Sequence, residues 1–329
     1  MAKVVTFYDN YEEKLAKAMD MYDMKKFAGK RVLIKIHVGE AGNKNYVDPK
    51  LAKVVIDKLK EVGAEPFLFD TLVLYPGPRA AKLTHRLVAK RHGFTDLGCP
   101  FVIGDKGEER KAQEIKFEIA QEVVDIDHMI VLSHGKGHGG AGYGGAIKNL
   151  GMGCVSKKCK SIVHSEISVP HPDVNKCTLC GTCEKVCKQK AIKVSDEWRM
   201  IPGLCVGCGD CLKACPQKAL DYKEEKLNHM LAYATEAVVE HMKEILYINV
   251  LLKISKSCDC ASFPGPIICE DVGIMVSDDM VSIDKASIDV IETRMGKTFK
   301  NINRVDPLEQ TETAEKIGLG SQEYKIEKI

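Results

Sequence analysis

The sequence predicts an α/β protein with a mainly parallel sheet flanked by helices, interrupted by a small inserted α+β domain. Apolar strand-like runs alternate with helical stretches on both sides of the middle of the chain, which is the pattern of βαβ units. A cysteine-rich repeat separates the two parts, and neither part looks complete without the other. We therefore expect one α/β domain made of residues 1–169 and 225–329, with residues 170–224 inserted at an exposed loop.

The first part shows the alternation most clearly. RVLIKIHV is a near-continuous apolar run of the kind that a parallel sheet buries on both faces. The capping box Asn10-x-x-Glu13 predicts the start of the first helix, and Asp48 followed by Pro49 predicts the start of the second. The expected strands are 4–8, 31–38, 66–70, 100–103, 115–124 and 128–133, and the expected helices are 10–29, 48–63 and 79–93.

The same alternation returns after the cysteine-rich repeat. Apolar residues at helical spacing predict a helix at 224–243, and the run ILYINVLLKI predicts a buried strand at 245–254. Asp284 is expected to begin a helix that stops near Gly296, and Asp306-Pro307 to begin a last one.

Eight of the fourteen cysteines lie in two runs with the spacing C-x2-C-x2-C-x3-C, 28 residues apart. The second run ends in Pro216, and the two runs also share Gly, Lys, Gln and Ala positions. Bacterial-type ferredoxins hold [4Fe–4S] clusters with this run, because two-residue spacers let three thiolates converge on one cube. The insertion is therefore predicted to be a bacterial-type ferredoxin domain with two [4Fe–4S] clusters.

In two-cluster ferredoxins the fourth cysteine of each run binds the other cluster. The expected ligand sets are Cys177, Cys180, Cys183 and Cys215 for cluster 1, and Cys205, Cys208, Cys211 and Cys187 for cluster 2. Lys188 stands where the first run would have proline. Its backbone N–H and its positive charge should raise the potential of the cluster bound by Cys187 relative to the other.

Two other uses of cysteine fit this spacing less well. A structural zinc site usually takes two C-x2-C pairs separated by a longer loop, with four ligands in total. A disulfide framework is typical of short secreted chains, whereas this chain is long and its first residues are not expected to form a signal peptide.

The composition bounds the location and the partners. Lys plus Arg (48) nearly balance Asp plus Glu (46), so charge gives no reason to expect nucleic acid or an acidic membrane as a partner. No apolar run approaches the length that spans a bilayer. We expect a cytoplasmic protein, and the oxygen-sensitive clusters suggest an anaerobe.

A second candidate site is the segment 133–153, SHGKGHGGAGYGGAIKNLGMG, which follows the strand expected at 128–133. Open α/β sheets bind ligands at the carboxyl ends of their strands. The candidate catalytic residues are His134, Lys136, His138 and Lys148, with imidazoles for proton transfer and lysines for an anionic group. The candidate cofactor-binding residues are Gly135, Gly137, Gly140, Gly142, Gly145 and Asn149.

This segment has two weaker interpretations. It meets the dinucleotide fingerprint G-x-G-x-x-G twice, but so many glycines do so by chance and no long helix follows. The second interpretation is a solvent-exposed glycine loop whose charged residues have no function. His37, Glu40 and Asp70 lie at other expected strand ends and are candidates to line the same crevice, although each alone is more commonly structural.

Further cysteines form a candidate third site. Cys258 and Cys260 form a CDC triplet, and Cys154 follows the glycine-rich segment. If strand 245–254 lies beside strand 128–133, these thiols meet at one sheet edge, where they could hold a third metal or cluster. The alternative is ordinary buried thiols, which are common in cytosolic proteins.

The chain resembles domain-of-unknown-function family 362. The blocks that carry the resemblance are VLIKIHVGEAGN, LFDTLVLYPGPR, VLSHGKGHGGAGYGGAIKNLGMG, and CDC followed by DVGIMVSDDMVSID. The resemblance covers nearly the whole chain, and members of this family often carry a ferredoxin insertion. It implies an iron–sulfur protein of archaea and anaerobic bacteria, and it supports treating the glycine-rich segment and CDC as one site.

These observations predict an iron–sulfur oxidoreductase whose clusters relay electrons to a small-molecule acceptor bound at the glycine-rich loop. The expected partners are an electron-donor or acceptor protein and an anionic ligand, and no organic cofactor is named by the sequence. One alternative is a ferredoxin-like electron carrier without its own catalysis. Another is a metal- or cluster-handling protein that uses the CDC thiols.

Overall fold

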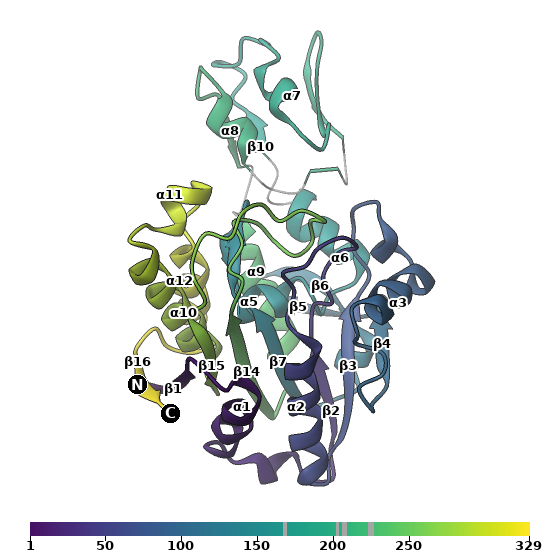
Figure 1. Ribbon diagram of the computed structural model, residues 1–329. Helices are drawn as coiled ribbons and strands as arrows, with labels where there is room; N and C mark the ends of the chain where they lie inside the picture. The colour runs from purple at the N-terminus through teal and green to yellow at the C-terminus, as the bar shows by residue number, and fades with distance from the viewer. Residues whose placement is uncertain (167–169, 202–203, 206–208, 223–226) are drawn as a thin grey trace.

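The computed structural model describes residues 1–166, 170–201, 204–205, 209–222 and 227–329 (Figure 1). The chain forms a larger lobe around an eight-stranded sheet and a smaller lobe that contains the cysteine-rich repeat. The two ends of the chain lie together at the edge of the sheet, where β1 pairs with β16.

The central sheet is mostly parallel. Its order is β16-β1-β15-β14-β7-β2-β3-β4, and β14, β7, β2, β3 and β4 form one parallel block. Only β15 runs antiparallel to its neighbours in this sheet. The strands are β1 (Ala2–Phe7), β2 (Arg31–Lys35), β3 (Glu65–Thr71), β4 (Phe101–Gly104), β7 (His128–His134), β14 (Glu244–Leu251), β15 (Gly273–Ser277) and β16 (Tyr324–Lys328).

Helices cover both faces of this sheet, as expected for an α/β protein. Successive strand residues point to opposite faces, so Leu33 packs in one core while Val32 and Ile34 pack in the other. One face carries α1 (Tyr11–Asp20), α2 (Pro49–Glu61) and α3 (Lys82–Arg91). The other carries α5 (Ala146–Gly151), α9 (Leu227–Val239), α10 (Met280–Met295), α11 (Phe299–Asn303) and α12 (Leu308–Lys316).

Smaller elements complete the larger lobe. They are α4 (Gln121–Val124), α6 (Lys157–Ser161), the hairpin of β5 (Gly107–Ala112) and β6 (Ile115–Ala120), and the hairpin of β8 (Lys136–His138) and β9 (Gly142–Gly144). Short 3₁₀ turns lie at Met24–Phe27 and Pro78–Ala80.

Several expected boundaries are wrong for identifiable reasons. Asn10 adopts a left-handed conformation without a side-chain cap, and α1 ends at Asp20 rather than at residue 29. Asp279, not Asp284, caps α10, because its carboxylate accepts the N–H groups of Val281 and Ser282. The segment expected as one strand at 115–124 ends at Ala120 and continues as a helical turn. By contrast, Asp48 caps α2 as predicted.

The smaller lobe is built as a structural repeat with the 28-residue offset of the sequence. Its elements are β10 (Pro170–Pro172), α7 (Thr182–Val186), β11 (Ile192–Val194), β12 (Trp198–Met200), α8 (Asp210–Ala214) and β13 (Leu220–Tyr222). The glycines before α7 and α8 have φ values of 71° and 69°, and Lys190 and Lys218 have φ values of 53° and 48°. The two halves therefore share backbone conformations as well as cysteine spacing.

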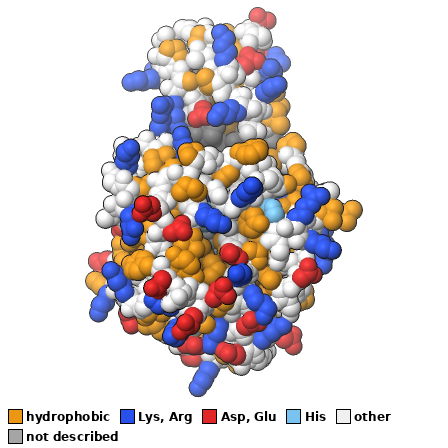
Figure 2. Space-filling model, viewed as in Figure 1, with side chains coloured by type: hydrophobic (Ala, Val, Ile, Leu, Met, Phe, Trp, Pro, Cys, Tyr) orange, Lys and Arg blue, Asp and Glu red, His pale blue; other side chains and the backbone are white. Residues whose placement is uncertain are grey.

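The expected borders of the insertion lie at or within segments outside the described residues, 167–169 and 223–226. On either side of them, β7 and β14 are parallel neighbours, so the sheet closes across the cysteine-rich residues. No helix in the described ranges is both long enough and apolar enough to cross a bilayer. Charged side chains of both signs are interspersed over the viewed face of the larger lobe (Figure 2).

Candidate functional site

A cavity of about 700 Å³ lies at the carboxyl ends of the parallel strands. His37 follows β2, Asp70 lies near the end of β3, and His134 ends β7, and all three line this cavity. Chain order reverses between β2 and β7, which is where open α/β sheets form ligand crevices. The volume is in the usual range for a small-molecule site, roughly 300–1,000 Å³.

The cavity wall is strongly cationic. Asp70 is the one acidic side chain among its described lining residues. Burial lowers the pKa of one lining lysine, Lys160, to about 7, so its charge varies near neutrality. The lining cations are Lys35, Arg79, Lys136, Lys148, Lys160 and Lys188.

Asp70 holds two of these cations in a buried cluster. Its carboxylate accepts hydrogen bonds from Lys35 Nζ at 3.1 Å and from Arg79 Nη2 at 2.9 Å, and His85 Nε2 lies 3.4 Å away. Burial alone would raise the pKa of Asp70, but the charges of Lys35 and Arg79 outweigh it and hold this pKa well below its usual value. The cluster fixes both cations in the cavity wall.

The glycines of the 133–153 segment serve packing more than ligand contact. Gly140 and Gly145 line the cavity, whereas Gly135, Gly137 and Gly142 are not among its lining residues. A Cβ at Gly137 would lie 2.2 Å from the carbonyl oxygen of Lys256, and one at Gly142 would lie 2.6 Å from that of Val305. These positions are glycine because another backbone passes directly beside them.

The backbone N–H groups of this segment are also used within the protein. Gly135 N donates to Val250 O at 2.9 Å, and Gly137 N donates to Ser255 O at 2.9 Å. Gly140 N donates to His138 Nδ1 at 3.2 Å. The N–H groups of these three glycines are therefore not free to bind an anion, and the cationic side chains are left to do so.

His134 and Lys136 hold the CDC triplet in place. His134 Nδ1 lies 2.8 Å from Asp259 Oδ2, and its Nε2 lies 2.7 Å from Leu252 O, so both ring nitrogens are engaged. Lys136 Nζ lies 3.6 Å from the same carboxylate oxygen and donates to His134 O at 2.8 Å. Asp259 is fully buried between them. Both candidate catalytic residues line the cavity, but their polar atoms are committed to Asp259 and the nearby backbone.

His138 and Lys148 converge on Cys258. His138 Nδ1 accepts the N–H groups of Gly140 and Ala141, so its neutral ring carries the proton on Nε2. Burial lowers the pKa of His138, opposed by a hydrogen bond with Cys258. Lys148 Nζ lies 3.8 Å from Cys258 Sγ. Burial opposes the charge of Lys148, but the nearby cysteines and Asp259 outweigh it and raise its pKa.

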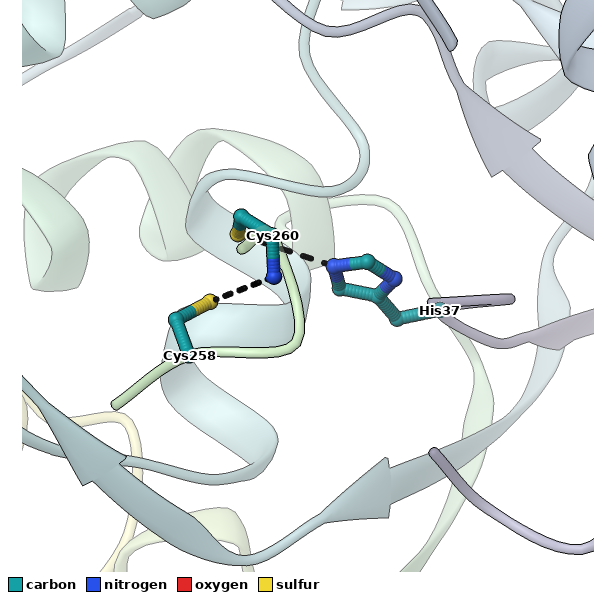
Figure 3. A group of neighbouring side chains, drawn as sticks. All are labelled: His37, Cys258 and Cys260. Atoms are coloured by element: carbon teal, nitrogen blue, oxygen red, sulfur yellow. Dashed lines mark hydrogen bonds between the residues drawn. The ribbon is translucent and has the colours of Figure 1, made fainter. Parts of the chain in front are cut away.

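His37, Cys258 and Cys260 form a group that could hold a metal ion, with ligand atoms within 4.8 Å of one another (Figure 3). Cys260 Sγ lies 3.6 Å from His37 Nε2, and Cys260 N lies 3.4 Å from Cys258 Sγ. A hydrogen bond from Cys260, together with Lys148, outweighs burial and holds the pKa of Cys258 well below its usual value. The same hydrogen bond and burial raise the pKa of Cys260.

The candidate third site changes its membership. β14 does lie beside β7, as the argument for this site required. However, Cys154 is fully buried in the apolar core after α5 and is not part of the group with Cys258 and Cys260. His37 takes that place, because the chain after β2 turns across the same edge. Burial raises the pKa of Cys154 to about 12, as for an ordinary core thiol.

The cysteines of the smaller lobe gather in two cavities, and none of the described cysteines is in a disulfide. One cavity is lined by Cys177, Cys180, Cys183 and Cys215. The second is lined by Cys187, Cys205 and Cys211, while Cys208 lies outside the described residues. Among the described cysteines, each cavity gathers those that the crossed pattern assigns to one cluster.

Backbone and side-chain donors point at these sulfurs. Ala191 N donates to Cys187 Sγ at 3.3 Å, and Ala219 N donates to Cys215 Sγ at the same distance, one in each half of the repeat. Thr182 Oγ1 lies 3.3 Å from Cys180 Sγ, where either atom can be the donor. Such donors stabilise negative charge on cysteine sulfur.

The cavity of Cys187, Cys205 and Cys211 adjoins the large cavity of the sheet. Gly139, Lys188 and Gln189 line both. Asn149 also lines the large cavity, and its Nδ2 donates to Leu132 O at 3.2 Å.

Sequence reasoning missed the residues that organise the site from within. Asp259 was not predicted as a site residue, although its position between the two candidate thiols of CDC indicates one. Arg79 was noted only as a helix start, although it follows the strand that ends at Asp70. Lys35 lies in an apolar run and Lys160 in a polar stretch, and neither context indicates a site residue.

These features define the class of the protein: an α/β protein with an open, mostly parallel sheet and a cationic, thiol-bearing cavity at its carboxyl edge. The family model described as "Domain of unknown function (DUF362)" matches residues 32–289, which is most of the chain. The chain therefore belongs to this family, as the sequence blocks indicated.

Similarity to solved structures concerns the fold only. The lactate racemase apoprotein from Thermoanaerobacterium thermosaccharolyticum matches at 15% identity and a TM-score of 0.41, covering 75% of this chain and 50% of its own. A protein from Thermotoga maritima matches at 12% identity and a TM-score of 0.47, covering 89% of this chain and 58% of its own. The chain thus spans about half the length of these proteins. No curated protein matches the sequence significantly.

Proposed function

We propose that the protein is an iron–sulfur oxidoreductase in which two [4Fe–4S] clusters of a ferredoxin-like insertion exchange electrons with an anionic small molecule bound in the large cavity. The observation that carries this proposal is the shared wall of the two cavities, formed by Gly139, Lys188 and Gln189. An electron source beside a substrate-sized pocket favours an enzyme over a carrier.

The thiol sets of the smaller lobe fit the proposed clusters. Four cysteines line one cavity and three described cysteines line the other, with N–H donors aimed at sulfur in matching positions of the two halves. When bound, the clusters supply single-electron transfer, which ordinary side chains do not provide.

The cationic wall supports an anionic acceptor. Six cationic side chains and a single carboxylate are found among the residues that the structure describes in the cavity wall. Arg79 is 2% exposed and is fixed by Asp70, so a ligand meets a preorganised guanidinium. A carboxylate, phosphate or thiol-bearing acid is the expected chemical type.

The residues that supply protons are proposed to be His138 and Lys148, both of which line the cavity. His134 and Lys136 are positioning residues in this proposal, since they contact Asp259 and hold the CDC turn. An electron-donor or acceptor protein is proposed to dock at the outer cysteine cavity, where Cys180 is exposed.

The test compares Lys188→Ala with Lys190→Ala. Both lysines are exposed and two residues apart, but only Lys188 lines the large cavity. Protein reduced anaerobically is mixed with nitrite, sulfite, fumarate or oxidised glutathione, and reoxidation is followed by visible absorbance. The parent and Lys190→Ala should react alike with at least one of these anions, and Lys188→Ala more slowly.

His138→Ala tests the proton donor in the same assay. General acid–base groups contribute about 10²–10⁴-fold, so its loss is easily measured. Iron content and reduction by an external donor should stay as in the parent. Equal reoxidation by all variants, with every anion, would favour the alternative function, an electron carrier without its own catalysis.

A second candidate function is metal handling at His37, Cys258 and Cys260, which the close approach of their ligand atoms favours. Thiolate and imidazole ligands select thiophilic ions such as zinc. Metal analysis of Cys258→Ser and Cys260→Ser decides it: a loss of one non-cluster metal per chain supports this function, and unchanged content removes it.

A further inference from the structure

Cys258 and Cys260 form one compact unit, separate from the thiols of the smaller lobe. Ala261 N donates to Cys258 O at 3.0 Å, which closes a β-turn over the CDC triplet. The turn brings both sulfurs within 4.8 Å of each other, and neither is in a disulfide. A disulfide would bring these sulfurs to about 2.05 Å.

Hydrogen bonds hold the backbone of this turn in place, whereas its two thiols are not in a disulfide. Asp259 O accepts the N–H of Glu40 at 2.9 Å, and the Asp259 carboxylate is held by His134 and Lys136. The backbone between the two cysteines is thus anchored to the ends of two different strands. A fixed backbone with movable thiols suits a pair that forms and breaks a bond.

The two sulfurs have different surroundings. Cys260 lines the large cavity, whereas Cys258 is not among its lining residues. Hydrogen-bond donors from Lys148 and from the backbone of Cys260 lie against Cys258 Sγ. Cys260 is therefore placed to meet a bound molecule, and Cys258 lies within 4.8 Å of it to act as the second sulfur.

His37 presents a ring N–H to the cysteine pair, so that binding a metal there would require the other tautomer. Gly39 N donates to His37 Nδ1 at 3.0 Å, so the neutral ring carries its proton on Nε2, the atom nearest to Cys260 Sγ. A metal-binding histidine instead donates its other ring N–H to an acceptor. In this structure the ring presents a donor, not a lone pair, to the cysteines.

We propose that Cys258 and Cys260 are a redox-active dithiol that cycles through an intramolecular disulfide, and that the anionic molecule bound in the cavity is itself a disulfide. This inference rests on the proposed function for its anionic ligand and its electron source.

The steps balance. The Cys260 thiol gives its proton to the Cys258 thiolate and attacks one sulfur of the bound disulfide, and the departing thiolate takes this proton from Cys258 and leaves as the first thiol. The Cys258 thiolate then attacks the Cys260 sulfur, which leaves a Cys258–Cys260 disulfide, and the second departing thiolate takes a proton from solvent. Two electrons and one proton restore the thiol and thiolate; on the proposed function, clusters bound in the smaller lobe would supply the electrons.

The test is a redox titration of the full chain, prepared anaerobically, in mixtures of reduced and oxidised dithiothreitol. Free thiols are alkylated at each potential and mapped by peptide mass spectrometry. Cys258 and Cys260 should lose alkylation together, with a tenfold change in the ratio of dithiol to disulfide per about 30 mV, as for a two-electron couple. Full alkylation of both at every potential would overturn the proposal.

The variant arm uses oxidised glutathione, an anionic disulfide, as the probe. Cys258→Ser should trap one glutathione on Cys260, because the resolving sulfur is gone. Cys99→Ser is the control, since Cys99 is half-buried and does not line the cavity, and it should behave as the parent. If Cys258→Ser does not fold, the titration of the parent protein still decides the proposal.

The outcome is separable from the proposed function. Dithiothreitol sets the potential in the titration, so the pair can close and open even if the clusters do not reduce it. Conversely, if another anion reoxidises the clusters but the cysteine pair does not titrate, the proposed function is supported and the proposal of a redox-active dithiol is refuted. A stoichiometric metal that blocks both alkylation and oxidation would also overturn it.

Discussion

Replacing Asp70 by Asn removes the charge of the buried ion cluster while keeping its volume. The carboxylate lies 3.1 Å from Lys35 Nζ and 2.9 Å from Arg79 Nη2, and the three side chains are between 1% and 4% exposed. The variant leaves two buried cations without their counter-charge.

The expected loss is large because it is the cost of uncompensated buried charge. Removing one partner of a buried ion pair costs about 3–5 kcal/mol. The surface pair of Lys53 and Asp57 provides the control, with side chains 48% and 53% exposed. Asp57→Asn should cost only about 0.2–1 kcal/mol. The gap between the two variants is a factor of roughly 30 or more in the unfolding equilibrium.

The assay is anaerobic urea unfolding followed by circular dichroism, at several pH values. Because the pKa of Asp70 is held well below its usual value, its contribution is present above the unfolded pKa of about 3.9 and is lost as the pH falls below it. The parent and Asp70→Asn should therefore differ most near neutrality and converge in acid. A loss no larger than that of Asp57→Asn at pH 7 would refute the buried cluster.

Further predictions concern the clusters, the sheet and the glycines. Anaerobically prepared protein should contain about eight iron and eight acid-labile sulfide per chain, and zinc in their place would contradict the cluster assignment. Burial raises the pKa of Asp284 to about 6, although N–H donors oppose it. The protonated Asp284 contributes stability below the unfolded pKa, so the stability of the parent relative to Asp284→Asn should fall as the pH rises from about 4 to 6. A stability difference in urea unfolding that stays constant over this pH range would contradict the raised pKa. Gly137→Ala should lower the melting temperature by several degrees, whereas Gly139→Ala should not, because a Cβ would lie 2.2 Å from Lys256 O at the first position and meets nothing within 4 Å at the second. Equal melting of the two would show that the loop has room to move. Joining the flanks of residues 170–222 through a Gly/Ser linker should leave a cooperatively unfolding larger lobe, since β7 and β14 pair directly; an aggregated product would place the domain boundary elsewhere.

The alternation of strands and helices could be predicted from the sequence because the spacing of apolar residues differs between a helix and a strand. RVLIKIHV is buried on both faces of the sheet and shows a continuous apolar run, and Asp48-Pro49 caps its helix through contacts two residues apart. β15 and β16 were not predicted. β16 is short and largely exposed, so its sequence does not show the apolar pattern of a buried strand.

The family and the crossed grouping of the described cysteines in the smaller lobe were also predicted from local sequence, because cysteine spacing is a property of a short segment. The role of the glycines was misread in part. Gly137 and Gly142 are explained by Lys256 and Val305, which are more than a hundred residues away in the chain. A sequence shows that glycine is present but not which distant backbone requires it.

The large cavity was decided by the tertiary structure alone. Its wall joins the ends of β2, β3 and β7 with the CDC turn and with Lys188 of the smaller lobe. His37 reaches Cys260 and Asp259 reaches His134 only because parallel strands end at one edge of the sheet. Periodicity and spacing report the contacts of a residue with its chain neighbours, whereas a site of this kind depends on strand order, which is set by packing across the whole sheet.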